Sequence, residues 1–158
     1  VLVSLKTFVA SGAFGPVVPS CNSAELEALF GPPEATGGQS RRHRRPSIWK
    51  YGDVQFFFAR SGGLRMVHLD TFVGPNRTPE GWGGLLLEPW CIREGLPLDE
   101  FLSVDGSGRV RPEPEFERVL VSYPSGVAVG FTPTGGLFGL WREWTDAEQA
   151  AAPDRRGE

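Results

Sequence analysis

The chain holds 158 residues, of which 40% are hydrophobic and 22% are charged, a composition that excludes an intrinsically disordered protein. This length fits one ordinary domain or two small units that share a core. The formal net charge of −3 argues against a general nucleic-acid-binding protein, because such proteins usually carry a basic domain or a basic stripe.

The N-terminal segment and the cysteines indicate a cytoplasmic protein. The first ten residues lack the basic start of a signal peptide, and Lys6 interrupts their apolar part. No apolar run reaches the roughly 18 residues that a membrane-spanning helix needs. Cys21 and Cys91 show no metal-binding spacing. Two reduced thiols in an intracellular protein are the preferred interpretation, and a disulfide between them is the alternative.

The first predicted elements are two helices separated by an extended connector. Apolar side chains at helical spacing predict a helix over residues 1–11. Glycine and proline make residues 15–19 an extended connector. A second helix is predicted over residues 20–30, with Ser and Asn side chains available as N-caps, and the Gly-Pro-Pro sequence at 31–33 ends it.

A polar, strongly basic loop at residues 34–47 precedes a predicted β-meander. Residues 47–51 and 54–59 are rich in aromatic and β-branched side chains, and they flank a Gly-Asp pair that suits a tight hairpin turn. Asp53 is interpreted as a residue that this turn requires. Residues 64–72 are predicted to form the third strand of the meander.

The second half of the chain predicts a similar series of elements. They are a Gly- and Pro-rich connector at 74–84, a short apolar strand at 85–92, a helix at 98–104, and strands at 116–123, 127–132 and 137–144. The Ala-rich and then charged tail, residues 146–158, is expected to fray.

The two halves also resemble each other in sequence. A shift of 73 residues aligns Val54, Phe58, Gly62, Gly63 and Leu64 with Val127, Phe131, Gly135, Gly136 and Leu137. A shift of 72 aligns Tyr51 with Tyr123. The repeat predicts an α+β fold in which two tandem helix–meander units form one antiparallel sheet with the helices on one face. The units are residues 1–73 and 85–145, joined by the connector at 74–84.

The helix that ends in Phe30-Gly31-Pro32-Pro33, followed by a hairpin, resembles a recurring bacterial unit. In that unit a helix ends in Leu-Gly-x-Pro and packs against an antiparallel meander. It occurs in the small lipoproteins of the outer-membrane assembly machinery and, duplicated, in the β-lactamase inhibitor protein fold. The segment 41–58 is also similar to small uncharacterised bacterial proteins. The resemblance covers residues 12–72 and, through the repeat, 87–144, and it implies the tandem fold and an inhibitor or immunity role.

The sequence contains no recognisable catalytic or cofactor-binding motif. Two histidines, His43 and His68, are too few for a histidine-based metal site, and no carboxylate spacing supplements them. The acidic residues show no paired arrangement for acid–base catalysis. No cofactor or metal is therefore expected, and the protein is not expected to be an enzyme. A hydrolase that depends on Cys91 or His68 is the remaining enzymatic alternative.

The densest charge lies at Arg41, Arg42, Arg44 and Arg45, which flank His43. Guanidinium groups on one loop suit a carboxylate-rich protein surface, phosphates or RNA, and a solvated loop without a partner is the alternative. Because counterion-driven binding to nucleic acid usually needs a broader basic surface, an acidic protein partner is favoured over nucleic acid.

The aromatic residues are expected on both faces of the sheet. Strict alternation places Phe57 opposite Phe56 and Phe58, so Phe57 and Ile48, together with Trp141 or Phe138, are expected on the face that no helix covers. Which face of the second unit is open depends on a turn that the sequence does not determine. An exposed aromatic patch on a sheet suits protein recognition.

These observations predict a non-enzymatic protein-binding protein of a bacterium, of the immunity or inhibitor type. Ile48, Phe57 and Trp141 would supply apolar anchors, and the four loop arginines would steer an acidic toxin or enzyme, which is then occluded. The alternative is a nucleic-acid or anionic-ligand binder centred on residues 41–45. No membrane contact is expected, and the sequence determines neither the oligomeric state nor the identity of the partner.

Overall fold

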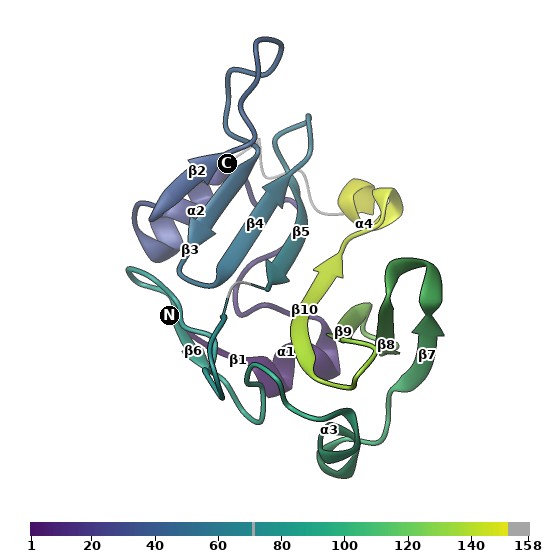
Figure 1. The fold of residues 1–158 in the computed structure, drawn as a ribbon. Coiled ribbons are helices and arrows are strands. Elements are labelled where there is room, and N and C mark those ends of the chain that lie inside the picture. The colour runs from purple at the N-terminus through teal and green to yellow at the C-terminus, as the bar shows by residue number, and fades with distance from the viewer. Residues whose placement is uncertain (71, 152–158) are drawn as a thin grey trace.

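An eight-stranded antiparallel sheet dominates the computed structural model, which describes residues 1–70 and 72–151 (Figure 1). The strand order is β2-β3-β4-β5-β10-β9-β8-β7, and β1 and β6 form a separate parallel pair. The strands are β1 (Leu2–Ser4), β2 (Ala35–Gly37), β3 (Ile48–Tyr51), β4 (Val54–Phe58), β5 (Leu64–Leu69), β6 (Leu86–Glu88), β7 (Arg109–Glu113), β8 (Arg118–Ser122), β9 (Val127–Phe131) and β10 (Leu137–Glu143). The helices are α1 (Leu5–Ser11), α2 (Ser23–Phe30), α3 (Leu98–Val104), α4 (Asp146–Ala151) and the 3-10 helix η1 (Pro114–Phe116).

This architecture confirms the predicted α+β fold class. Helices α1 and α2 lie behind the sheet in the view of Figure 1, and aromatic contacts join α2 and α3 to the same face of the sheet. Phe30 of α2 stacks on Phe56 at 5.9 Å between ring centroids, and Phe101 of α3 contacts Phe131 at 5.5 Å. No helix within the described ranges has both the length and the hydropathy needed to cross a membrane.

The core of the first unit is a cluster of aromatic rings around Phe56. Its ring has centroid distances of 5.7 Å to Phe14, 5.9 Å to Phe30 and 5.7 Å to Tyr51, and all four side chains are fully or almost fully buried. The Tyr51 hydroxyl donates to the carbonyl of Gly31 at 2.9 Å. Burial raises the pKa of Tyr51 to about 12, so the phenol stays protonated in this hydrogen bond.

The sequence repeat is visible in the register of the two meanders. In the β4–β5 hairpin, Phe57 pairs with Met66 and Phe58 with Leu64, so Arg65 is an extra residue on β5. In the β9–β10 hairpin, Gly130 pairs with Gly139 and Phe131 with Leu137, so Phe138 is the extra residue on β10. Positions 65 and 138 are 73 residues apart, the spacing of the repeat. Each unit therefore carries its β-bulge at the equivalent place.

A difference in turn length accounts for the change of the repeat spacing from 72 to 73. In the first unit, Tyr51 pairs with Val54 across a two-residue turn, as predicted. In the second unit, the Val127 carbonyl accepts from the Tyr123 amide at 3.0 Å across the three residues 124–126. The additional residue in this turn shifts all later positions by one.

Capping residues define the first two helices. Asn22 and Glu25 form a capping box at the start of α2, and Gly31 ends that helix. The Ser4 side chain accepts from the Thr7 amide at the start of α1, so the helix begins at Leu5 and not at residue 1. The predicted helix over residues 1–11 is therefore wrong at its start, where β1 pairs with β6.

Several elements differ from the sequence-based expectations. Strand β2 lies within the segment expected to be a loop, and β7 lies in a region to which no element was assigned. The 3-10 helix η1 includes Phe116, the first residue of the strand expected at 116–123, and β8 begins only at Arg118. Residues 146–151 form α4 where a frayed tail was expected. The rest of that expected tail, 152–158, lies outside the described residues. Single short elements of this kind depend on tertiary pairing, which local periodicity does not report.

Asp53 has a larger role than the turn prediction assigned to it. Its side chain is almost fully buried and accepts two hydrogen bonds from the Arg77 guanidinium, at 3.1 and 3.0 Å, and one from the Glu80 amide at 2.8 Å. The Asp53 amide donates in return to the Glu80 carbonyl at 2.8 Å. The carboxylate therefore attaches the connector between the two units to the β3–β4 turn.

Candidate functional site

The face of the sheet opposite the helices carries three of the predicted anchor residues together. Ile48 pairs with Phe57 across β3 and β4, and Trp141 pairs with His68 across β10 and β5. Directly paired residues share a face of the sheet, and so do residues two apart on one strand. Gln55 lies two residues before Phe57 and pairs with His68, so Ile48, Phe57, His68 and Trp141 all lie on one side. We call this side the open face.

Aromatic side chains form a continuous row across the centre of the open face. The centroid distances are 6.3 Å from Phe57 to His68 and 5.5 Å from His68 to Trp141, whose rings meet edge to face. Phe138 lies against Trp141 at 6.2 Å. We call Phe57, His68, Trp141 and Phe138 the aromatic row. All four are half-buried, so each ring packs on its neighbours and still reaches solvent.

Glycine at position 130 lets the second half of this row lie close to the sheet. A Cβ atom at Gly130 would meet Phe138 Cζ at 2.6 Å and Trp141 Cζ3 at 2.9 Å. Both distances are shorter than real Cβ contacts allow, so the two rings occupy the space that any larger residue would take. The Phe138 and Trp141 rings therefore pack directly on the backbone of β9 at Gly130.

Arg118 extends the row toward the far edge of the sheet. Its guanidinium carbon lies 5.3 Å from the Trp141 ring centroid and 4.9 Å from that of Phe116, distances at which cation–π attraction acts. Phe116 is 62% exposed. The Glu113 carboxylate holds Arg118 through two hydrogen bonds of 3.1 and 3.0 Å. The sequence analysis did not identify these residues, because η1 was not predicted.

The arginines of residues 41–45 lie at the opposite edge of the sheet. The loop between β2 and β3 projects from the top of the molecule in Figure 1, and a pair of backbone hydrogen bonds between Ser40 and His43 closes its tip. Arg41, Arg42, Arg44 and Arg45 are exposed and make no ion pair within the described parts of the chain. The loop leads directly into Ile48, so it borders the open face but is not part of its aromatic row.

His68 sits at the centre of the aromatic row in a partly desolvated position. Its side chain is 22% exposed, and Nδ1 lies 3.6 Å from Oδ2 of Asp70. Burial lowers the pKa of His68, and the negative charge of Asp70 opposes that shift. The other atom of this carboxylate, Asp70 Oδ1, is buried and accepts no hydrogen bond within the described residues. At neutral pH the row therefore contains an uncharged imidazole.

The lowered pKa of His68 predicts a loss of stability in mild acid. As the pH falls below about 6.5, the unfolded chain binds a proton at this histidine before the folded protein does. The free energy of unfolding should therefore decrease from that pH down through the folded-state pKa. Urea denaturation at a series of pH values measures the decrease. The His68→Gln variant should lack this decrease in the free energy of unfolding. The His43→Gln variant, changed in the exposed loop, should still show it.

The environment of Cys91, one of the two alternative catalytic residues, does not favour a nucleophile. Cys21 is buried and Cys91 is half-buried, and neither forms a disulfide. Burial raises the pKa of the Cys91 thiol, which reduces the thiolate fraction that a nucleophile needs. No group of three His, Cys, Asp or Glu side chains in residues 1–70 and 72–151 is arranged to hold a metal ion.

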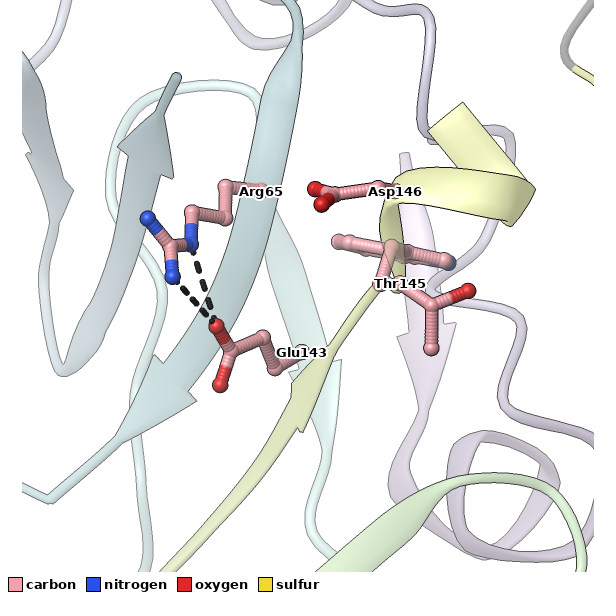
Figure 2. A pocket seen from close by; sticks show the side chains of 5 residues that line it. Arg65, Glu143, Thr145 and Asp146 are labelled. Atoms are coloured by element: carbon pink, nitrogen blue, oxygen red, sulfur yellow. Dashed lines mark hydrogen bonds and ion pairs between the residues drawn. The ribbon is translucent and has the colours of Figure 1, made fainter. Parts of the chain in front are cut away.

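A shallow polar hollow lies at one end of β10. It is lined by Arg65, Glu143, Trp144, Thr145 and Asp146, and Figure 2 shows the labelled side chains around it. Arg65 donates to Glu143 through Nε at 3.0 Å, and a second nitrogen lies 3.0 Å from the same oxygen. The bulge residue Arg65 thus closes one side of the hollow with an ion pair between the two units.

Comparison with known proteins gives a weak structural similarity. No family model matches the chain, and no curated protein matches it. A DUF4309 family protein (YjgB) from Bacillus subtilis subsp. subtilis strain 168 is similar in structure, with a TM-score of 0.46 and 14% sequence identity over 84% of each chain. We draw no conclusion about fold or function from a similarity at this level. The resemblance to the β-lactamase inhibitor protein fold stays a prediction.

Proposed function

We propose that the protein binds another protein through its open face, as an immunity or inhibitor protein does, and that it blocks a toxin or enzyme by covering it. The main support for this proposal is the aromatic row, which runs without a break across β4, β5 and β10 at the centre of the face opposite the helices. The protein itself performs no chemistry in this proposal.

The composition of the open face supports a protein partner. Binding energy in protein interfaces concentrates in aromatic and arginine residues near the centre of the contact. Trp141 lies next to both His68 and Arg118, close to the middle of the eight-stranded sheet. Neighbouring rings already hold these side chains in place, so binding costs little additional conformational entropy.

Removal of two anchors tests this proposal. Wild-type protein immobilised as bait should retain one stoichiometric protein from an extract of the source organism at high salt, since apolar burial is insensitive to screening. Phe57→Ala combined with Trp141→Ala should lose that protein, with an affinity reduced at least about a hundredfold by the removal of two central aromatic anchors.

A matched control comes from outside the eight-stranded sheet. Leu86 is 60% exposed on β6, which pairs only with β1 in the separate two-stranded sheet, so Leu86→Ala should retain the partner. Thermal unfolding of all variants checks that each is folded. Equal retention by the wild type and by the double variant would contradict binding through the open face.

The four unpaired loop arginines favour one alternative, a binder of nucleic acid or another polyanion. Binding of that kind weakens steeply as salt rises, because each phosphate contact releases counterions. Fluorescence anisotropy of a labelled single-stranded RNA, measured from low to physiological salt, distinguishes the two functions. A complex that persists without any protein partner and disappears at moderate salt would place the function in residues 41–45.

A further inference from the structure

A second group of arginines borders the open face at its far edge. Arg109 pairs with Ser122 and Arg111 with Leu120 across β7 and β8. Ser122 pairs in turn with Ala128 on β9, and Ala128 pairs with Trp141 on β10. Since directly paired residues share a face, Arg109 and Arg111 point to the side of the sheet that carries Trp141. We call Arg109, Arg111 and Arg118 the arginine ledge.

One buried carboxylate, that of Glu113, binds two arginines of the ledge but does not neutralise the positive charge of all three. Glu113 is 8% exposed and binds Arg118 at 3.0 Å and Arg111 at 3.4 Å. Arg109 is exposed and has no ion pair within the described residues. The ledge therefore has three guanidinium groups and one carboxylate, which binds two of them. Glu113 and the aromatic rings fix Arg118, which gives the ledge a defined geometry for a planar anion.

Two further carboxylates lie on the open face, near its central strands and away from its charged edges. Glu143 binds Arg65 at 3.0 Å, and Asp70 lies 3.6 Å from His68, which is uncharged at neutral pH. The open face thus has unpaired positive charge at both edges, the loop of residues 41–45 at one and the arginine ledge at the other, although the chain as a whole has a formal charge of −3. Complementary charge on a partner must therefore be negative at both edges.

We propose that the partner of the open face is an acidic protein whose side-chain carboxylates dock on the arginine ledge while its apolar residues cover the aromatic row. This inference rests on the proposed function and adds the chemistry of the partner. The two charged edges are separated by six strand intervals, from β3 to β7, or about 30 Å at about 4.8 Å per interval. A contact of that breadth matches a folded protein surface of standard interface size.

A central carboxylate and the orientations of the rings favour a protein over nucleic acid at this face. Asp70 lies beside the uncharged His68 in the middle of this face and would repel a phosphate backbone that tracks across the strands, whereas the carboxylates of a protein partner need to lie only at the two edges. The rings of the row also change orientation from one to the next, by 50° between Phe57 and His68 and by 90° between His68 and Trp141. Within the row only Trp141 and Phe138 are near parallel, at 27°, so the row as a whole does not offer the series of parallel faces on which successive bases stack.

Selection from a library of displayed random 12-residue peptides tests the proposal without knowledge of the natural partner. The wild-type protein should enrich peptides that combine Asp or Glu with aromatic or aliphatic residues. The dissociation constant of a synthetic enriched peptide should rise at least about tenfold on Arg109→Glu with Arg111→Glu, because attraction becomes repulsion. Replacement of its acidic residues by Gln should weaken binding to the wild type similarly.

Lys6→Glu with Arg60→Glu is the matched control, since it changes the net charge equally at exposed positions outside the ledge. This control should bind the acidic peptide as the wild type does. Neutral or basic enriched peptides, no enrichment, or an unchanged dissociation constant on the ledge variant would each overturn the inference. Tighter binding of a 12-mer of uridylate than of the acidic peptide would overturn it in favour of nucleic acid.

The aromatic double variant separates this inference from the proposed function. If Phe57→Ala with Trp141→Ala abolishes peptide binding and the ledge variant does not, the open face binds protein but the acidic preference is wrong. If the aromatic double variant binds the selected peptides as tightly as the wild type, the proposed function itself is wrong, and with it the inference that rests on it.

Discussion

Replacement of Phe56 by alanine is expected to lower the free energy of unfolding by about 3–5 kcal/mol, the range for a fully buried phenylalanine. The Phe56 side chain has no exposed area and contacts the rings of Phe14, Phe30 and Tyr51. Its removal leaves a cavity that α2 and β3 cannot close without moving their own aromatic rings. Urea denaturation of the purified variant measures the change.

Phe57 supplies the matched control from the next position in the chain. It points to the open face and is half-buried, so Phe57→Ala should cost less than about 1.5 kcal/mol because much of its surface is already in water. The two variants remove the same atoms one residue apart. Similar losses of stability in both would contradict the assignment of the helix-covered and open faces.

Replacement of Asp53 by alanine is expected to lower the free energy of unfolding by about 2–4 kcal/mol. The change removes the acceptor of the partly buried hydrogen bond from the Glu80 amide and the partner of Arg77, and a donor left unsatisfied in the protein interior costs about 1–3 kcal/mol. The Arg77 side chain is 40% exposed, which reduces the cost of losing its partner because water can replace the carboxylate.

The measurement for Asp53→Ala is again urea denaturation, combined with limited proteolysis of the connector between residues 74 and 84. The connector should be cleaved faster in the variant, because its attachment to the β3–β4 turn is lost. Glu115→Ala removes an exposed carboxylate on η1 and should leave both properties unchanged. An Asp53 variant as stable as this control would mean that the ion pair does not anchor the connector.

Local patterns in the sequence predicted the meanders well. Alternation separated Phe56 from Phe57, and the Gly-Asp pair placed the turn between β3 and β4. The parallel pairing of β1 with β6 could not be predicted, since it joins Leu2 to Leu86 across the whole first unit. Three-residue strands carry too little periodicity to distinguish them from a helix end or a loop.

Only the part of the candidate site that lies in the first unit could be predicted from the sequence. Alternation placed Ile48 and Phe57 on the open face, but the orientation of Trp141 depended on the turn at residues 124–126 and on the bulge at Phe138. Each of these features shifts a strand by one residue, which exchanges its two faces. Arg118 was missed for a different reason, because its contacts with Phe116 and Glu113 require the η1 turn between β7 and β8.

The central strand pair has a consequence for the symmetry of the open face. Strands β5 and β10 are antiparallel, and His68 pairs with Trp141, its equivalent in the repeat. The two units are thus related by an approximate two-fold axis through this pair, the symmetry of a homodimer that joins two sheets edge to edge. In a homodimer the axis would place the same residue on both sides. Covalent linkage removes that constraint, so an imidazole and an indole face each other and the open face is asymmetric.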